Sequence, residues 1–275
     1  MSSENTVLVL GGTGKTGRRI IQRLHERSLS VRSGSRSATP AFDWADETTW
    51  TAALQDISSV YIAFQPDLAV PGAVATIQKF VDLAVQSGVR RLVLLSGRGE
   101  AEAQSCEEIV QRSGVDWTIL RASWFFQNFS ENFLLDALLS PEVYLPAGEV
   151  QEPFIDADDI ADVAVAALTE AGHAGQVYEL TGPRMLTFAD AVAEIAAASG
   201  RSIRYQQVPI AAYVAALEAE QVPSDMVWLV QYLFTTVLDG RNAYVADGVQ
   251  RALGRPPGDF SAYVHTTAAA GVWNS

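Results

Sequence analysis

The stretch that most constrains the fold is residues 7–17, VLVLGGTGKTG. Four apolar residues run directly into a turn with four glycines, and residues 18–26 then place apolar side chains on one helical face. A strand, a glycine-rich turn and a helix in this order form a phosphate-binding site. The glycines allow close backbone approach, and the helix N-terminus presents unpaired N–H groups and a positive dipole end. This stretch therefore predicts a bound phosphate group.

Two phosphate-binding motifs compete for this stretch. The tripeptide GKT at 14–16 is similar to the end of a P-loop, but that motif requires a glycine where the chain has Val9. The dinucleotide-binding motif fits, because Gly12, Gly14 and Gly17 give the spacing G-x-G-x-x-G between a strand and a helix. An ordinary glycine-rich turn between strand and helix is the alternative. The flanking pattern favours dinucleotide binding.

Composition argues against several other classes of function. The formal net charge is −13 and the chain has only two lysines, so we expect neither nucleic acid nor an anionic membrane as a partner. One cysteine excludes an intramolecular disulfide, and three scattered histidines give no zinc-binding spacing, so no metal site is expected. The N-terminal residues lack a signal-peptide pattern, and no apolar run reaches about 18–20 residues. A cytoplasmic protein is therefore expected.

Beyond the first helix, short apolar runs alternate with helical patterns. Such runs are typical of strands in a parallel sheet that is covered on both faces. The later segments expected to form strands are 30–33, 41–44, 60–64, 91–95, 116–120 and 176–180. The pattern predicts an α/β fold, a doubly wound parallel sheet of the Rossmann type, over residues 1–182. Residues 183–275, mostly helical, are expected to form a smaller substrate-binding or lid lobe, to which 126–150 contribute.

The region after the second expected strand favours NADP(H) over NAD(H). An NAD-binding fold has an acidic residue about 20 residues after the glycine motif, which binds the ribose hydroxyls. The chain has no Asp or Glu between Glu26 and Asp43. Ser35 and Arg36 occupy this region instead, and a guanidinium is a charged fork suited to a 2′-phosphate. A solvated loop arginine is the alternative interpretation.

Loops at the carboxyl ends of parallel strands line the ligand crevice of such a fold. Phe64 and Gln65 follow one apolar run and are candidate cofactor contacts. Ser96 and Gly97 follow the next run, where the Ser96 hydroxyl could reach the nicotinamide or a substrate oxygen.

Polar residues beside aromatic residues mark two further candidates. Asp43 could accept a hydrogen bond from the adenine amino group, and Trp44 could either cover a ring or pack on the sheet. Trp124, Phe125 and Asn128 lie in an aromatic stretch beyond a strand end, which is either a substrate wall or the start of a packed helix. The amide of Asn128 requires polar partners in such a cluster.

Segments spread over most of the chain, through to about residue 190, resemble the NmrA-like branch of the atypical short-chain dehydrogenase/reductases. The matching segments are GGTGKTG (11–17), SGSRS (33–37), FDW (42–44), LVLLSG (92–97), ILRASWFFQNFSE (119–131), PFIDADDIADVA (153–164) and YELTGPRMLTF (178–188). Within this branch the chain looks most similar to the reductases of ergot-alkaloid biosynthesis, which reduce a C=N bond with NADPH. One departure is Ala122, where such proteins commonly carry proline after the arginine.

The resemblance implies specific roles for the candidate residues. The pyrophosphate would be held by the glycine motif that ends at Gly17, through Gly11, Thr13, Gly14, Lys15 and Thr16. Ser35 and Arg36 would hold the 2′-phosphate of NADP(H). The ribose–nicotinamide end would be lined by Phe64, Gln65, Ser96 and Gly97, and the substrate would be bordered by Trp124, Phe125 and Asn128.

The sequence lacks the acid–base pair of the usual short-chain dehydrogenases. In those enzymes a lysine four residues after a tyrosine lowers its pKa for proton transfer, but no tyrosine of this chain has that lysine. Ser96 alone stands where the third member of that catalytic set would lie.

Two functions remain. One is an NADPH-dependent oxidoreductase that transfers hydride to a small iminium, quinone, or activated C=C or C=O substrate. The alternative is a non-catalytic NADP(H)-binding redox sensor of the NmrA type. A monomer or a homodimer is expected.

Overall fold

The computed structural model describes residues 6–131 and 134–274 of the 275-residue chain. The chain divides into two units. The first unit contains the described residues up to Ala122, with Ala157–Leu180 and Asp247–Arg255. The second unit contains Ser123–Asp156, Thr181–Ala246 and the described residues from Pro256 onward.

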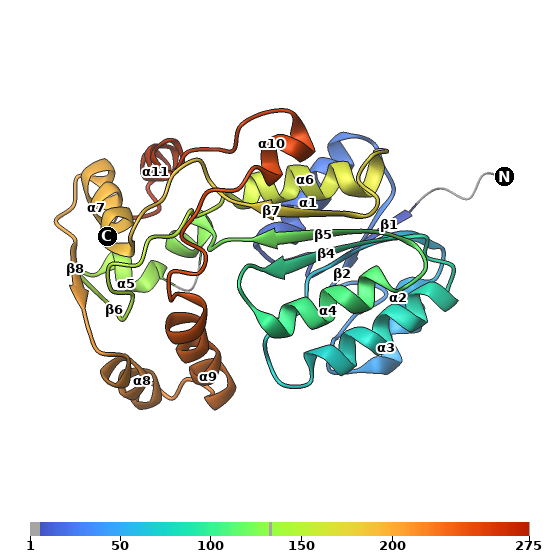
Figure 1. Cartoon of the computed structure of the whole chain (residues 1–275), viewed down its shortest axis with the longest axis horizontal. Helices are drawn as coiled ribbons and strands as arrows, with labels where there is room; N and C mark the ends of the chain where they lie inside the picture. The colour runs from blue at the N-terminus through green and yellow to red at the C-terminus, as the bar shows by residue number, and fades with distance from the viewer. Residues whose placement is uncertain (1–5, 132–133, 275) are drawn as a thin grey trace. The chain divides into compact units, whose positions relative to one another are not determined.

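The first unit is built on a six-stranded sheet with the order β2-β1-β3-β4-β5-β7 (Figure 1). The strands are β1 (Thr6–Leu10), β2 (Val31–Gly34), β3 (Ile57–Ile62), β4 (Arg91–Gly97), β5 (Asp116–Ala122) and β7 (Gln176–Leu180). All neighbouring pairs are parallel. The strand order reverses at β1, with β2 on one side and β3 on the other. Such a reversal places a ligand crevice at the carboxyl ends of the strands. The predicted Rossmann-type sheet is confirmed.

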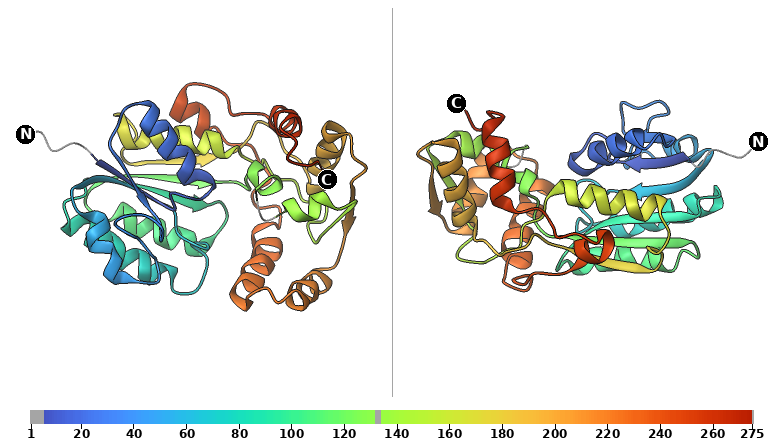
Figure 2. Two further views of the ribbon diagram at one scale, coloured as in Figure 1. Left: turned by 180° about the vertical axis from the view of Figure 1, so that it is seen from behind. Right: turned by 90° about the horizontal axis from the view of Figure 1, so that it is seen from above.

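Helices cover both faces of this sheet (Figures 1 and 2). One face carries α1 (Lys15–Glu26) and α6 (Ala157–Thr169), and the other carries α2 (Trp50–Leu54), α3 (Ala73–Gln86) and α4 (Ala101–Gln111), with η1 (Glu47–Thr49) leading into α2. α1 and α6 are joined by ion pairs from Arg23 to Asp158 and Asp162. Among the helices that the structure describes, none combines the length and the apolar character needed to cross a membrane.

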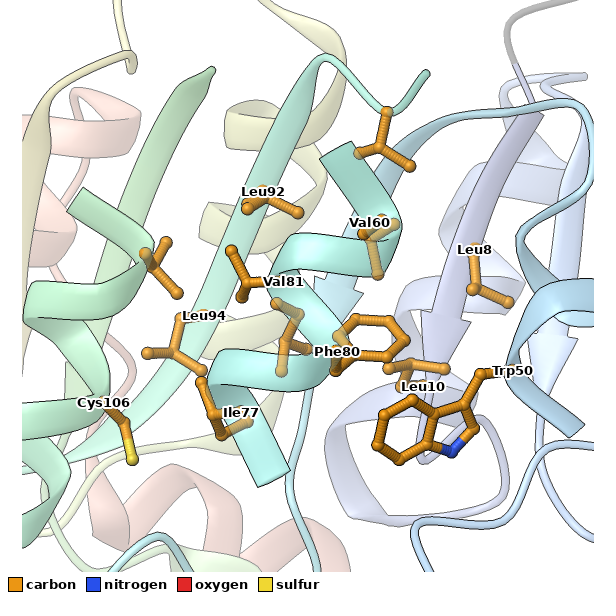
Figure 3. Packing of buried hydrophobic residues seen from close by; sticks show 14 of the residues in the cluster. Leu8, Leu10, Trp50, Val60, Ile77, Phe80, Val81, Leu92, Leu94 and Cys106 are labelled. Carbon is orange, nitrogen blue, oxygen red and sulfur yellow. The ribbon is translucent and has the colours of Figure 1, made fainter. Parts of the chain in front are cut away.

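The core between the sheet and α2–α4 is rich in aromatic side chains (Figure 3). Phe80 of α3 is fully buried, and its ring centroid lies 5.6 Å from that of Trp50 and 5.7 Å from that of Phe42. Apolar side chains of the central strands complete this layer, because both faces of a doubly wound sheet are shielded from water. The labelled strand residues are Leu8, Leu10, Val60, Leu92 and Leu94.

Residues 41–44 form no strand, so this part of the predicted sheet is wrong. The segment has only an isolated bridge between Asp43 and Asp46. The Asp43 backbone is occupied locally: its amide donates to the Thr49 hydroxyl over 3.0 Å, and its carbonyl accepts from the Trp50 indole over 2.8 Å. Side chains from the following turn thus form the hydrogen bonds with the Asp43 amide and carbonyl that a neighbouring strand such as β2 would otherwise form.

The second unit combines helices with a two-stranded parallel sheet. Its elements are η2 (Phe126–Phe129), α5 (Leu135–Leu139), β6 (Glu142–Leu145), α7 (Phe188–Ser199), β8 (Arg204–Gln207), α8 (Ile210–Ala219), α9 (Ser224–Tyr232), the π-helix η3 (Leu233–Val237) and α11 (Phe260–Ala269). α7 and α11 pack side by side (Figure 2). Rings from four of its segments, Phe126, Phe129, Phe154, Phe188 and Phe260, fill the core.

One segment from beyond the expected boundary at 182/183 groups with the first unit. α10 (Gly248–Leu253) groups with the first unit, although it follows most of the second unit in the chain. A Cβ atom on Gly248 would overlap the Glu179 carbonyl, so α10 approaches β7 closely because this residue has no side chain. Arg251 extends the contact by donating to the Gln176 side chain over 3.0 Å. This association depends on packing between distant segments, which no local pattern reveals.

We expect Phe80→Ala to reduce the free energy of unfolding of the protein by about 3–5 kcal/mol, because it removes a fully buried ring from an aromatic cluster. Urea denaturation followed by tryptophan fluorescence measures the change. Val74→Ala is the matched control, since Val74 lies on the same helix but is 39% exposed, and its effect should stay within about 0.5 kcal/mol. Equal effects of the two substitutions would contradict the assigned core.

Candidate dinucleotide-binding site

The turn between β1 and α1 is held in one conformation by its own backbone. Gly11 has φ +66°, a left-handed conformation that glycine adopts without steric cost. Its carbonyl accepts a hydrogen bond from the Gly14 amide over 2.8 Å, which closes the turn, and Thr13 lies exposed within it. The Gly12 amide donates to the Gly34 carbonyl over 3.3 Å and so joins the turn to the end of β2.

The remaining glycines of the motif allow close approach. A Cβ atom on Gly17 would overlap the Gly11 carbonyl, and one on Gly12 would overlap the Ser33 side chain. The first turn of α1 can therefore lie directly against the β1 turn only because these positions have no side chain. The spacing G-x-G-x-x-G follows from this packing.

The N-terminus of α1 has the features of an anion-binding site. Gly14 is its N-cap and provides no side-chain hydrogen bond, and the first turn contains no acidic residue. The positive end of the helix dipole is therefore not offset by a local carboxylate. Lys15 is the first helical residue.

The Thr16 hydroxyl is buried and accepts a hydrogen bond from the Tyr61 hydroxyl over 3.0 Å, which fixes the turn against β3. Burial raises the pKa of Tyr61, so its hydroxyl remains protonated.

The segment after β2 presents a guanidinium beside this turn. The Ser35 carbonyl accepts from the amides of Ala38 and Phe42 over 3.1 and 2.9 Å, which folds the loop back on itself. Arg36 is exposed at the tip. Within the part of the chain that the structure describes, Arg36 forms neither a hydrogen bond nor an ion pair, so its charge is available to an external anion.

Of the other candidate residues after β2 and β3, some pack against the core and others are exposed to solvent. The Trp44 indole donates to the Ala63 carbonyl over 3.1 Å, and its ring lies 5.0 Å from that of Phe64, so both rings pack at the edge of the core. The Asp43 carboxylate accepts from the Ala45 amide over 3.0 Å and thereby stabilises its own turn. Gln65 is exposed at the carboxyl end of β3.

The hydroxyl of Ser96 is already engaged at the end of β4. It donates to Glu107 of α4 over 2.6 Å, and both side chains are buried. Arg121 of β5 donates to the same carboxylate over 2.6 Å. Because its proton points to Glu107, Ser96 can accept a hydrogen bond from a ligand but has no proton to donate. Gly97 follows directly, at the last position of β4.

Sequence reasoning missed a carboxyl pair at this same edge. Glu100 is only 5% exposed and is hydrogen-bonded to Asp67, which lies in the loop after β3. A Cβ atom on Gly97 would overlap the Glu100 carboxyl, so this group lies directly on the end of β4. Burial, followed by the Asp67 charge, raises the pKa of Glu100 to about 9, and burial also raises the pKa of Asp67. The sequence did contain a signal for this pair, namely one acidic residue after each of two strands that are adjacent in the sheet.

All the predicted cofactor contacts lie in the first unit, whereas the three predicted substrate contacts lie in the second. The Trp124 ring packs 5.2 Å from Phe188 and 5.3 Å from Phe234. Phe125 is the N-cap of η2, and its carbonyl accepts from the Asn128 amide over 3.1 Å. In residues 6–131 and 134–274, no group of three or more His, Cys, Asp or Glu side chains is arranged to hold a metal ion.

A family model described as NAD(P)H-binding matches residues 11–171, which include the glycine turn, the Arg36 loop and the ends of β3 and β4. The chain belongs to this NAD(P)H-binding family. An NAD(P)H azoreductase of Xenophilus azovorans is 30% identical, over 96% of this chain and 98% of that protein. An agroclavine dehydrogenase of Claviceps fusiformis is 32% identical, over 94% of this chain and 96% of that protein.

The fold is also that of the negative transcriptional regulator NmrA, whose crystal structure matches with a TM-score of 0.72 at 16% identity, over 98% of this chain and 97% of that one. The predicted placement in the NmrA-like branch of the atypical short-chain dehydrogenase/reductases is thereby confirmed. At the level of the family, the comparisons also confirm a dinucleotide cofactor of the NAD(P)H type and an oxidoreductase class.

We expect Glu100→Gln to be less sensitive to alkaline pH than the unmodified protein. A pKa raised from 4.5 to about 9 means that the folded state retains a proton that the unfolded state loses. The stability gained from this proton is complete below pH 4.5 and is lost as the pH rises toward 9. Melting temperatures measured across this range should therefore fall more steeply for the unmodified protein.

Glu108→Gln is the matched control for this measurement, because Glu108 lies exposed on α4, whose N-cap is Glu100, and forms an ion pair with Arg112. It should keep the pH dependence of the unmodified protein. Parallel melting curves for Glu100→Gln and the unmodified protein would contradict the raised pKa.

Proposed function

We propose that this protein is an NADPH-dependent oxidoreductase that transfers hydride to a small organic substrate. The observation that carries the proposal is the anion site at the N-terminus of α1, beside the exposed guanidinium of Arg36. The helix N-terminus suits a pyrophosphate, and the guanidinium suits a further phosphate. NADPH carries both groups.

The cofactor residues take their roles from this geometry. The pyrophosphate would bind the backbone of Gly11 to Gly17 at the start of α1, where Gly12 and Gly17 allow close approach. Arg36 and the Ser35 hydroxyl would hold the 2′-phosphate. When bound, the cofactor supplies the hydride. Phe64, Gln65, Ser96 and Gly97, at the carboxyl ends of β3 and β4, would line the ribose–nicotinamide end, with Ser96 acting as an acceptor.

The substrate is proposed to contain an electron-poor double bond, as in an iminium, a quinone or an azo compound. The name of the azoreductase relative indicates an N=N bond, and the likeness to agroclavine dehydrogenase agrees with an alkaloid-like C=N bond. An iminium accepts hydride without a proton donor, and a quinone or an azo compound can take its proton from a group other than the Tyr-x-x-x-Lys pair that the chain lacks. Trp124, Phe125 and Asn128 are proposed to contact the substrate.

A second candidate function is an NADP(H)-binding redox sensor without turnover. The missing Tyr-x-x-x-Lys pair and the fold shared with the regulator NmrA favour it. The two candidates share the cofactor site and differ only in whether a substrate is reduced.

We expect NADPH to raise the melting temperature more than NADH does, because only NADPH offers a 2′-phosphate to Arg36. Arg36→Ala should weaken NADPH binding by about 10–100-fold, the loss of one charge-assisted hydrogen-bonding group of about 1.5–3 kcal/mol. NADH binding should change little. Titration calorimetry with both cofactors measures this selectivity.

Arg112→Ala is the charge-matched control, since Arg112 is the exposed C-cap of α4 and pairs with Glu108, away from the proposed cofactor site. Equal affinity of the unmodified protein for the two cofactors, or unchanged selectivity in Arg36→Ala, would contradict the NADPH assignment.

The purified protein should oxidise NADPH with at least one member of a panel that contains a naphthoquinone, a monoazo dye and a cyclic iminium salt. Loss of NADPH absorbance measures turnover. Tight NADPH binding without turnover on any of them would exclude the oxidoreductase and favour the sensor.

A further inference from the structure

We propose that Asp67 and Glu100 share one proton and donate it to the substrate atom that receives the electron pair during reduction. The assignment rests on the proposed oxidoreductase function. It supplies the proton donor that the missing Tyr-x-x-x-Lys pair leaves unassigned.

The position of the pair follows from the sheet. Asp67 lies in the loop after β3, and Glu100 is the N-cap of α4, three residues after the end of β4. β3 and β4 are adjacent parallel strands, so their carboxyl ends meet at the same edge. The Glu100 carboxyl lies on Gly97, and the Ser96 hydroxyl that precedes it is engaged by Glu107. The pair therefore occupies the edge where the nicotinamide ring is proposed to bind.

The pair differs from two other carboxylates nearby in having no cation. The buried Glu107 is paired with Arg121 over 2.6 Å, and the partly exposed Glu179 with Arg98 over 3.4 Å. Throughout the described residues, no lysine or arginine forms an ion pair with Asp67 or Glu100. Two adjacent carboxyl groups without a counter-charge cannot both ionise, so one proton stays between them.

One oxygen of the pair lacks a hydrogen-bond partner among the described residues. Glu100 Oε2 is buried and, among the described residues, has no hydrogen-bond partner. Such an atom inside a protein costs free energy unless a bound molecule supplies a partner. A substrate oxygen or nitrogen that accepts the shared proton would satisfy this oxygen.

The charges that face Glu100 all favour its protonated form. Asp67, Glu102 and Glu107 each raise its pKa, which lies at about 9, although the charge of Glu107 is offset by Arg121. The amide of Ala69 acts in the opposite sense, because it donates to Asp67 over 2.8 Å and lowers the pKa of that carboxyl. At neutral pH the pair thus carries one proton and one negative charge.

The proton completes the chemistry for neutral substrates. Hydride from NADPH adds to one atom of the C=O, C=C or N=N bond, and the electron pair of that bond moves to the other atom. The shared proton passes to this second atom, which leaves NADP⁺, the reduced substrate and a doubly ionised pair that regains a proton from water. An iminium needs no proton, because hydride addition neutralises its charge. Loss of the donor should therefore affect neutral substrates far more than an iminium.

The test compares Glu100→Gln with the unmodified protein on the naphthoquinone, the monoazo dye and the cyclic iminium salt. Glutamine keeps the shape and a hydrogen bond to Asp67 but is a far weaker acid. We expect kcat to fall by about 10²-fold on the quinone and the dye, the usual contribution of a general acid, and far less on the iminium. The affinity for NADPH should stay within about two-fold, as a fold control.

The pH profile provides a readout that a structural role would not change. With the unmodified protein, kcat on the quinone should decline as the pH rises through about 9, and Glu100→Gln should lose this decline. Full activity of Glu100→Gln on the quinone, or an equal loss on all three substrates, would overturn the assignment.

Failure of the proposed function gives a different result, namely an unmodified protein that binds NADPH and reduces none of the substrates. The infrared band of a protonated carboxyl then decides whether the pair holds a proton. Its presence at pH 7 in the unmodified protein and its loss in Glu100→Gln support the shared proton, and its absence overturns it.

Discussion

The structure depends on the close approach of the first turn of α1 to the carboxyl end of β1. Gly17 lies so near the Gly11 carbonyl that no side chain fits between them. This approach directs the N-terminus of α1 to the edge where β1 separates β2 from β3. The candidate cofactor contacts of the first unit are then found in the first turn of α1, at the end of β4 and in the loops that leave this same edge.

Charge is distributed unevenly along that edge. The β1 and β2 loops present an uncapped helix N-terminus and Arg36, both suited to phosphates. The β3 and β4 loops present Asp67 and Glu100, which have no cationic partner among the described residues. A dinucleotide with phosphates at one end and an uncharged reactive face at the other would match this gradient. Phosphate binding is thus proposed at the β1 and β2 loops, and proton donation to the substrate at the β3 and β4 loops.

The turn between β1 and α1 could be predicted from sequence because its causes are local. Glycine spacing and the helical period after Leu10 determine the turn and the start of α1. The strand expected at 41–44 is wrong because the side chains of Thr49 and Trp50 occupy the Asp43 backbone, and no periodicity reports such contacts. The carboxyl pair was missed because its meaning depends on burial and on the adjacency of β3 and β4. The roles of Trp124, Phe125 and Asn128 stay predictions.

The placement of α10 has a consequence for the autonomy of the two units. The chain passes between them five times, and the last return brings Asp247–Arg255 to β7. No single cut in the polypeptide therefore releases a complete cofactor-binding half. Fragments that end near residue 182 would leave the β7 side of the sheet without the helix that Gly248 admits. The two units therefore alternate along the chain, and each depends on segments that are far apart in the sequence.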